Sequence, residues 1–276
     1  MTPQSASPPR ATPRAGLPYG PCALVTGASE GIGLAMAQEL ARQGYDLVLV
    51  ARRRERLEML AAELRAAHGS TVIVLPADLG STSDVEQILR ETEGLDIGLF
   101  VAAAGFGSAG SFVDLPLGNE LNMVDVNCRA VVAMTHPIAQ RLIARKRGGI
   151  VLFSSIVAFQ GVAKFATYAA TKAFVQSFAE GLRLELKPLG VDVLAVAPGP
   201  VATGFASRSG MFMPRAEKPE VVAREALAQL GKASTARPGF LAKTMEFGLS
   251  MLPRRGRVRM ISMAMDGMAN RKDAKG

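Results

Sequence analysis

The 276-residue sequence has no tryptophan, only two histidines and only two cysteines. The histidines, His68 and His136, provide neither a ligand cluster for a metal nor a base for a Ser/His hydrolase. The cysteines, Cys22 and Cys128, fall in a predicted strand and a predicted helix, so we expect a reduced, cytoplasmic protein. No apolar stretch reaches the length of a membrane span.

Acidic residues are absent from residues 1–20, and the basic residues are concentrated at both ends of the chain. Of the net charge of +8, residues 1–20 contribute +2 and residues 243–276 contribute +5, which leaves +1 for residues 21–242. Because the central part is nearly neutral and its aromatic residues are not interleaved with basic ones, we expect no nucleic-acid partner. Residues 1–20 lack a secretory apolar core and predict a disordered arm, with an organellar transit peptide as the alternative.

Six apolar runs of strand length alternate with segments of helical length. The runs are residues 23–25, 47–50, 72–75, 99–103, 150–153 and 191–196. This alternation predicts an α/β fold, a single doubly wound parallel sheet with helices on both faces, over residues 21–242. No repeat or composition break indicates a second domain. In such a sheet the ligand crevice lies at the carboxyl ends of the strands.

A glycine-rich turn, Thr26-Gly27-Ala28-Ser29-Glu30-Gly31-Ile32-Gly33, separates the first apolar run from a predicted helix at 32–43. Gly27 permits a tight exit from the strand, Gly31 lets the backbone approach a ligand, and Gly33 lets the helix pack closely. The start of the helix then offers free N–H groups and a positive dipole end to a pyrophosphate. The turn therefore predicts dinucleotide binding.

The second predicted strand, residues 46–50, is followed by Arg52, Arg53 and Arg54. An acidic residue at this strand end would bind the ribose hydroxyls of NAD, whereas arginine accommodates the 2′-phosphate of NADP. We therefore expect NADP(H) in preference to NAD(H), with Arg52 and Arg53 as contacts and Arg54 facing water. The alternative is a solvated basic start to a helix at 53–68, although cations there would oppose the helix dipole.

Tyr168 and Lys172 lie four residues apart, and Ser155 precedes Tyr168 by thirteen residues. Residues i and i+4 share one face of a helix, so an ammonium beside the phenol is expected to lower its pKa. Tyr168 would then be a usable general acid and base. The alternative for Tyr168 and Lys172 is a chance pair on one helix. The alternative for Ser155 is that it only caps the end of the strand, and its neighbour Ser154 is the better candidate for a structural role.

In this order the motifs resemble those of the short-chain dehydrogenase/reductase family over roughly residues 20–205. The resemblance implies a Rossmann-type fold and places Asp78 at the adenine contact, Asn127 at the catalytic asparagine and Pro198-Gly199 with Thr203 over the nicotinamide. One position departs from the family pattern. Ala102-Ala103-Ala104-Gly105 replaces the usual Asn-Asn-Ala-Gly, which puts local hydrogen bonding between strands in doubt.

The resemblance also implies a mechanism, hydride transfer from NADPH to a carbonyl carbon or the reverse. Tyr168 would protonate the oxygen and Ser155 would hydrogen-bond it. Lys172 would tune Tyr168 and hold the nicotinamide ribose, and Asn127 would anchor a water that passes protons to Lys172. For Asn127 a helix-bending or surface amide is the alternative. The implied cofactor contacts are Gly27, Ser29, Glu30, Gly31, Ile32, Gly33, Arg52, Arg53, Asp78, Leu79, Ala104, Gly105, Tyr168, Lys172, Pro198, Gly199, Val201 and Thr203.

Apolar residues near these motifs predict a hydrophobic ketone, aldehyde or 3-oxoacyl substrate, although some of them can be plain core. They are Ile156, Val157, Phe159, Phe165, Phe205, Met211, Phe212 and Met213. Residues 199–218 predict a mobile lid before a helix at 220–230. The alternative function is a non-catalytic NAD(P)-sensing or scaffold protein on the same fold, and the intact catalytic set favours the enzyme.

The segment 243–276 is basic and rich in methionine. After Pro253, the residues Val258, Ile261, Met265 and Met268 form an i, i+3, i+7 apolar stripe. The stripe predicts a C-terminal helical extension that packs on the domain or at a subunit interface; we expect a homodimer or homotetramer. The alternative is a basic amphipathic element in peripheral contact with an anionic membrane.

Overall fold

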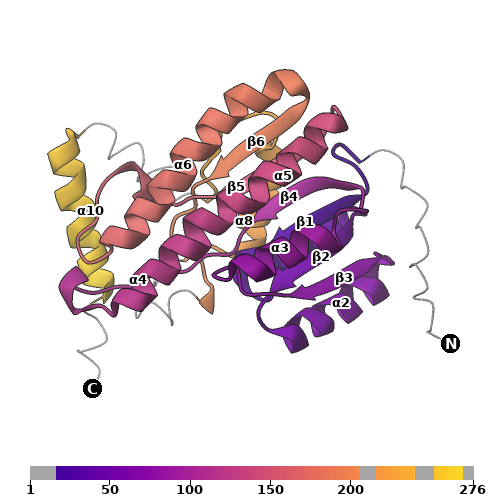
Figure 1. Cartoon of the computed structure of the whole chain (residues 1–276). Helices are drawn as coiled ribbons and strands as arrows, with labels where there is room; N and C mark the ends of the chain where they lie inside the picture. Colours follow the sequence, from indigo (N-terminus) through magenta and orange to yellow (C-terminus); the bar gives the residue numbers. More distant parts are fainter. Residues whose placement is uncertain (1–16, 205–215, 240–251, 270–276) are drawn as a thin grey trace.

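The computed structural model describes residues 17–204, 216–239 and 252–269, the last four without their side chains. These residues form a parallel sheet of seven strands in the order β3-β2-β1-β4-β5-β6-β7 (Figure 1). The strands are β1 (Cys22–Thr26), β2 (Asp46–Ala51), β3 (Val72–Pro76), β4 (Ile97–Ala102), β5 (Gly148–Phe153), β6 (Val191–Val196) and β7 (Thr235–Ala236). The predicted α/β class and all six predicted strands are confirmed.

The strand β7 was not predicted, because it has only two residues and no apolar run. It extends the sheet through backbone hydrogen bonds from the Ala195 N–H to the Ser234 carbonyl and from the Ala197 N–H to the Ala236 carbonyl. Such a strand is specified by its neighbour β6 rather than by its own side chains.

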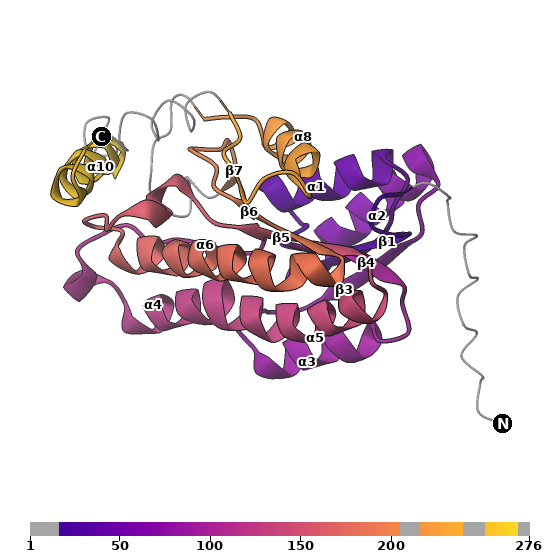
Figure 2. The ribbon, with the colours of Figure 1, turned by 90° about the horizontal axis from the view of Figure 1, so that it is seen from above.

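Helices cover both faces of the sheet (Figure 2). One face carries α1 (Gly31–Arg42), α2 (Arg54–His68) and α8 (Pro219–Gln229), and the other carries α3 (Thr82–Glu91), α5 (Ala130–Ala144) and α6 (Ala166–Leu186). Successive strand side chains alternate between the two apolar clusters: Ala23 and Val25 join one, and Leu24 joins the other. The strand order reverses between β1 and β4, where a ligand crevice is expected.

Shorter elements follow β4, β5 and α6. Beyond β4 come a 3₁₀ turn, η1 (Phe112–Asp114), and then α4 (Leu117–Val124), which continues through a π-helical turn, η2 (Asp125–Arg129), into α5. Another 3₁₀ turn, η3 (Ile156–Phe159), follows β5, and η4 (Lys187–Leu189) ends α6. The π turn inserts one extra residue per turn and so changes which side chains face the site.

Residues 17–20 pack against the domain, so the prediction of a disordered arm is wrong for them; residues 1–16 lie outside the described residues. The Tyr19 hydroxyl donates a hydrogen bond to an Asp192 carboxylate oxygen at 3.0 Å. The Arg145 guanidinium donates to the Tyr19 carbonyl at 3.3 Å. These partners are more than a hundred residues away in sequence, and no local pattern indicates them.

The C-terminal extension forms α10 (Arg254–Ala269), which packs on the domain. Ile261 is 2% exposed, Val258 and Met265 are half-buried as the predicted stripe requires, and the Met268 side chain lies outside the description. Among the helices that the structure describes, none has the length and apolar character needed to cross a membrane.

Candidate active site

A cavity of about 360 Å³ lies at the carboxyl ends of the strands. Every residue that the sequence assigned to the cofactor lines it, from Gly27 at the end of β1 to Thr203 beyond β6. Three of the four predicted catalytic residues, Ser155, Tyr168 and Lys172, line the same cavity. The fold therefore brings together side chains and backbone from most of the chain length at one edge of the sheet.

The glycine turn fits the end of β1 closely against the β4 backbone. Gly27 has φ +69°, and a β carbon there would stand 2.8 Å from the Ala104 nitrogen. A β carbon on Gly33 would stand 2.2 Å from the Gly27 carbonyl oxygen, so α1 can begin here only if this residue has no side chain. These contacts explain why the turn requires glycine at both positions.

The Thr26 hydroxyl joins β1 to β4 at the position where the family's usual asparagines are missing. It accepts a hydrogen bond from the Ala104 N–H at 3.2 Å and lies 3.4 Å from the Val101 carbonyl, to which it donates. Local hydrogen bonding between the strands is therefore present, and the backbone of Ala104 and Gly105 remains in the cavity wall.

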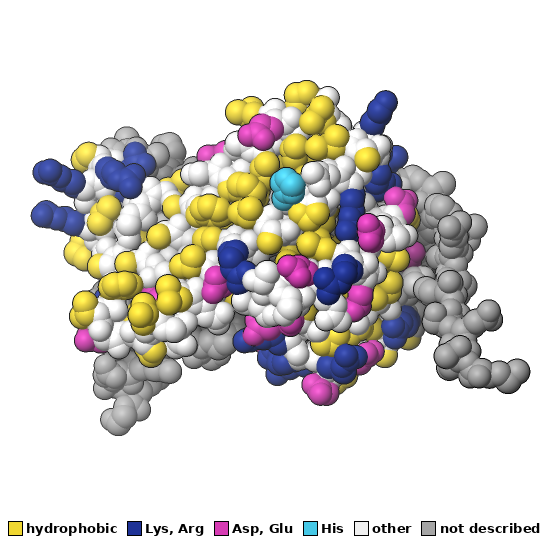
Figure 3. Space-filling model, viewed as in Figure 1, with side chains coloured by type: hydrophobic (Ala, Val, Ile, Leu, Met, Phe, Trp, Pro, Cys, Tyr) yellow, Lys and Arg dark blue, Asp and Glu magenta, His cyan; other side chains and the backbone are white. Residues whose placement is uncertain are grey.

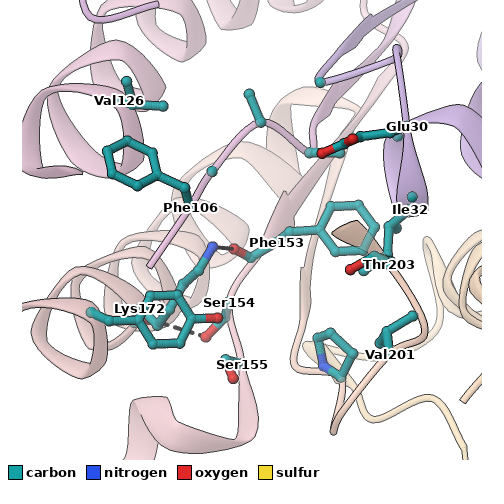
Figure 4. Close-up of a pocket in the computed structure, with 18 of the residues that line it drawn as sticks. Glu30, Ile32, Phe106, Val126, Phe153, Ser154, Ser155, Lys172, Val201 and Thr203 are labelled. Atoms are coloured by element: carbon teal, nitrogen blue, oxygen red, sulfur yellow. Dashed lines mark hydrogen bonds between the residues drawn. The ribbon is translucent and has the colours of Figure 1, made fainter. Parts of the chain in front are cut away.

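The arginines after β2 differ in their position relative to the cavity. Arg52 and Arg53 line the cavity, whereas Arg54 does not. An Arg53 guanidinium nitrogen lies 2.8 Å from a Glu30 carboxylate oxygen and donates to the Ser29 hydroxyl at 3.0 Å. In Figure 4, Glu30 lies across the pocket from Lys172 and Ser155. The cavity thus has a basic end and a separate end that carries the proton-transfer residues.

At that second end, Ser155 follows β5, and Tyr168 and Lys172 lie one turn apart on α6. Tyr168 is hydrogen-bonded to the Ser155 side chain. The Lys172 ammonium lies 5.9 Å from the centre of the Tyr168 ring and donates to the Phe153 carbonyl at 2.8 Å (Figure 4). The three side chains form one cluster that can exchange a proton with a bound group.

Ser154 has the structural role that the sequence suggested. Its buried hydroxyl donates a hydrogen bond to the Lys172 carbonyl at 3.0 Å and so ties the end of β5 to α6. Ser155, by contrast, lines the cavity, and its hydroxyl also accepts a long hydrogen bond of 3.4 Å from the Val157 N–H. Ser155 therefore caps the strand end and faces the site at the same time.

The prediction that Lys172 lowers the pKa of Tyr168 is wrong in this structure. Burial raises the pKa of Tyr168 to about 12, and the hydrogen bond with Ser155 opposes the rise. Burial also lowers the pKa of Lys172 to about 8. Burial is the largest cause of both pKa shifts, and the Lys172 ammonium is directed at the Phe153 carbonyl. Tyr168 is consequently protonated near neutrality, as a proton donor must be.

Asn127 lies in the π turn and is 1% exposed, so it is not a surface amide. Its side chain accepts from the Phe106 N–H at 3.1 Å and donates to the Phe106 carbonyl at 2.9 Å and to the Thr171 hydroxyl at 3.1 Å. It does not line the cavity. The Asn127 side chain fixes the backbone after β4 against α6, beside Gly105.

The predicted lid has its two ends joined. The Glu217 N–H donates to the Pro200 carbonyl and the Ala202 N–H donates to the Glu217 carbonyl, both at 2.8 Å. Residues 205–215 lie outside the described residues, together with the predicted wall residues Phe205, Met211, Phe212 and Met213. The mobile lid remains a prediction.

The remaining predicted wall residues behave differently from one another. Ile156 and Val157 line the cavity. Phe165 is 2% exposed in the apolar cluster beneath the site. The Arg237 guanidinium lies over Phe159, 5.0 Å from the centre of the Phe159 ring. Phe159 and Phe165 are therefore structural, in line with the expectation that some of the apolar residues belong to the core.

Sequence reasoning missed several residues of the cavity wall, notably Phe106, Val126, Phe153 and Met265. Phe106 directly follows Gly105, and Phe153 ends a predicted strand. Both therefore lie near the carboxyl end of a strand, where the cavity was expected, and this position could have indicated them. Met265 belongs to the predicted C-terminal stripe, but no local signal shows that this stripe reaches the site.

The fold and the site together define a Rossmann-type, nicotinamide-dependent oxidoreductase. Residues 21–211, more than half of the chain, match the family model described as short chain dehydrogenase. The chain therefore belongs to the short-chain dehydrogenase/reductase family and is an oxidoreductase that interconverts alcohols and carbonyls.

Known proteins similar to this chain include a very-long-chain 3-oxoacyl-CoA reductase from Anas platyrhynchos, 33% identical over 85% of this chain and 76% of its own length. A 7β-hydroxysteroid dehydrogenase structure has a TM-score of 0.83 at 28% identity, covering 88% of this chain and 97% of its own. A short-chain dehydrogenase from Sphingobium yanoikuyae in complex with NADPH has a TM-score of 0.75 at 32% identity, covering 85% and 97%.

Proposed function

We propose that the protein uses NADPH to reduce the carbonyl group of a hydrophobic ketone, aldehyde or 3-oxoacyl substrate to an alcohol, or catalyses the reverse reaction. The observation that carries the proposal is the convergence of Ser155, Tyr168 and Lys172 at one end of a cavity that has Arg52 and Arg53 near its other end. That separation suits a long cofactor that carries a phosphate at one end and the reactive ring at the other.

The residues present fit such a cofactor. The glycine turn leaves backbone exposed at the start of α1, where a pyrophosphate is favoured by free N–H groups and the helix dipole. Glu30 lies 2.8 Å from Arg53 and 3.6 Å from Arg56, and the guanidinium groups of Arg52 and Arg53 in this part of the cavity wall can donate charge-assisted hydrogen bonds to a 2′-phosphate. When bound, the cofactor supplies the hydride.

In this proposal Tyr168 donates its hydroxyl proton to the carbonyl oxygen as negative charge develops there. Ser155 hydrogen-bonds the same oxygen and stabilises that charge. Lys172, while it is an ammonium, stabilises the Tyr168 phenolate that results and holds the nicotinamide ribose. Asn127 keeps the turn after β4 in place and anchors the water through which Lys172 is resupplied with protons.

The hydrophobic substrate is supported by the wall around the catalytic residues, which includes Phe106, Val126, Ile156, Val157 and Met265. Two of the similar proteins have names that refer to very-long-chain 3-oxoacyl-CoA and to 7β-hydroxysteroids, which are both large and apolar. A site of this kind favours apolar groups and discriminates weakly between them.

The proposal is tested by measuring NADPH oxidation over a panel of ketones, aldehydes, 3-oxoacyl thioesters and oxosteroids, with NADH assayed beside it. We expect turnover of the large apolar members and a preference for NADPH. A strong NADH preference would overturn the role of the arginines. NADPH binding without turnover of any member would favour the non-catalytic sensor instead.

We also propose a homodimer formed through the face of α4, α5 and α6. Exposed apolar residues run along this face: Leu121 is 56% exposed, Val132 38% and Phe174 41% (Figure 3). A stable interface hides roughly 800 Å² on each partner, and a dimer through this face would cover these exposed side chains. Sedimentation should show a dimer that Val132→Glu dissociates, whereas Met59→Glu, exposed on α2, should leave it intact. A monomeric wild-type protein would contradict the assembly.

For location we propose a cytoplasmic protein whose α10 touches anionic membranes. Its outward side carries Met260 and Met263, 48% and 69% exposed, beside the exposed Arg255 and Arg259. The chain should pellet with vesicles that contain phosphatidylglycerol and much less with pure phosphatidylcholine. A Met260→Ser, Met263→Ser double variant that pelleted as well as the wild type would remove this proposal.

A further inference from the structure

The helix α10 reaches the catalytic end of the cavity although it lies outside the part of the chain that matches the family model, residues 21–211. Its Met265 lines the cavity and packs with Tyr168 around one apolar cluster. The arginine end of the cavity is formed by residues that follow β1 and β2. The place of Met265 is therefore beside the reacting groups and not beside the 2′-phosphate site.

Two contacts hold α10 in this position. Ile261, one turn before Met265, is 2% exposed in the cluster that contains Val157 and Phe165. The Ser262 hydroxyl accepts a hydrogen bond from the Ala163 N–H at 2.9 Å. An apolar anchor and a hydrogen bond on consecutive residues fix both the depth and the rotation of the helix, so Met265 has a defined direction.

The segment that α10 holds leads directly into Tyr168. Lys164, next to Ala163, has φ +62°, a conformation that is costly for a residue with a side chain. Its carbonyl accepts a hydrogen bond from the Gly110 N–H at 2.9 Å. This segment is thus held on one side by α10 and on the other by the loop after β4. The helix that carries Met265 therefore also helps to position Tyr168.

The other described methionines of α10 provide the contrast. Met260 is 48% exposed and Met263 69% exposed, and neither lines the cavity. Methionine is unbranched and adapts its shape to neighbouring apolar groups. At position 265 the side chain can therefore adapt its shape to a substrate in the cavity, whereas the side chains at 260 and 263 face outward and do not contact the cavity.

We propose that α10 is a wall of the substrate compartment and that Met265 determines the bulk of the hydrophobic carbonyl that the site accepts. This inference rests on the proposed function and adds to it a specificity-determining residue that lies outside residues 21–211, the part that matches the family model. Shortening the side chain opens space beside Tyr168 for bulky, rigid ketones, and a rigid aromatic ring at the same place closes it.

The test compares kcat/KM for one bulky polycyclic ketone and one small ketone in the wild type, Met265→Ala, Met265→Phe and the matched control Met263→Ala. We expect the bulky-to-small ratio to rise about tenfold in Met265→Ala and to fall in Met265→Phe, since one apolar group is worth about 1–3 kcal/mol in such a pocket. Met263→Ala should leave the ratio unchanged. Equal ratios in Met265→Ala and Met263→Ala would overturn the inference.

The same four proteins can also be compared without turnover. Calorimetry gives the dissociation constants of the two ketones, with NADP⁺ present so that no reduction occurs. The same tenfold shift in the affinity ratio is expected for Met265→Ala alone, and the dissociation constant for NADPH should be unchanged in all variants. If the wild type binds the ketones but reduces none, the proposed function fails and the role of α10 is still decided. If affinities do not depend on residue 265, the inference fails even in an active enzyme.

Discussion

The side chain of Lys172 is 7% exposed and directs its ammonium at a backbone carbonyl, and in the proposed mechanism this ammonium stabilises the phenolate that Tyr168 becomes. Burial lowers the pKa of Lys172 to about 8, so the ammonium is present below that pH and is lost as the pH rises through it. Without the positive charge, the phenolate left after proton donation is no longer stabilised.

We therefore expect kcat/KM for carbonyl reduction to be constant near pH 7 and to fall up to tenfold per unit once the pH passes about 8. Tyr168, whose pKa is raised to about 12, titrates above this range. The measurement is a pH–rate profile between pH 6 and 10, with the NADPH dissociation constant followed over the same range as the control. A flat profile to pH 10 would rule out this role for Lys172.

Tyr168→Phe removes the donated proton and little else, because only the hydroxyl is lost. We expect NADPH affinity to be unchanged and kcat to fall by about 10²–10⁴, the usual contribution of a general acid. Steady-state kinetics on a confirmed substrate together with NADPH titration provides the measurement. Tyr19→Phe, which alters a phenol at the amino end of the sheet, is the matched control and should retain kcat.

Arg53→Ala tests the basic end of the site. Hydrogen bonds to charged groups contribute about 1.5–3 kcal/mol, so the KM for NADPH should rise about 10–100-fold while the KM for NADH barely changes. Arg54→Ala is the control, since Arg54 is adjacent in sequence, lies off the cavity and is paired with Glu58 at 3.8 Å. An equal effect of both substitutions on both cofactors would show that the discrimination lies elsewhere.

At the scale of single elements, the glycine turn was predictable because its requirement is local. The backbone geometry of Gly27 and the close approach at Gly33 follow from a strand that must turn immediately into a helix. The π turn that holds Asn127 and the two-residue β7 were not predicted, since both depend on the segments packed against them.

Gly33→Ala should disrupt the turn, because a β carbon there would meet the Gly27 carbonyl oxygen at 2.2 Å. We expect NADPH binding to weaken and thermal stability to fall. The control is Gly94→Ala in the exposed turn after α3, where nothing lies within 4 Å of the added carbon, and it should leave NADPH binding and thermal stability nearly unchanged. Calorimetric NADPH titration and thermal melts distinguish the two; normal NADPH binding by Gly33→Ala would contradict the packing argument.

At the scale of the whole molecule, two terminal segments close opposite ends of the sheet. Residues 17–20 pack where the strands begin, and α10 packs where they end, at the substrate cavity. Loss of the first should reduce stability without changing activity, whereas a change in the second should alter specificity.

Tyr19→Phe removes the hydrogen bond to Asp192, and we expect the free energy of unfolding to fall by about 1–3 kcal/mol with kcat unchanged. Urea denaturation measures it. A double-mutant cycle with Asp192→Ala separates the coupling between the two side chains from their individual effects. Zero coupling energy would show that residues 17–20 are held by the other contacts alone.

The sequence by itself determined the class of fold and the six longer strands, because these follow from short-range patterns, and the resemblance of its motifs to a known family gave the residues assigned to the cofactor. Apolar runs specify buried parallel strands, glycine permits the turn at β1, and the spacing between Tyr168 and Lys172 places them on one face of α6. Only the tertiary structure decided the pKa of Tyr168, the hydrogen bonds of Thr26 and Asn127 and the arrival of Met265 at the site. Desolvation and packing between segments far apart in the chain have no local signature, so they appear only once the segments are folded together.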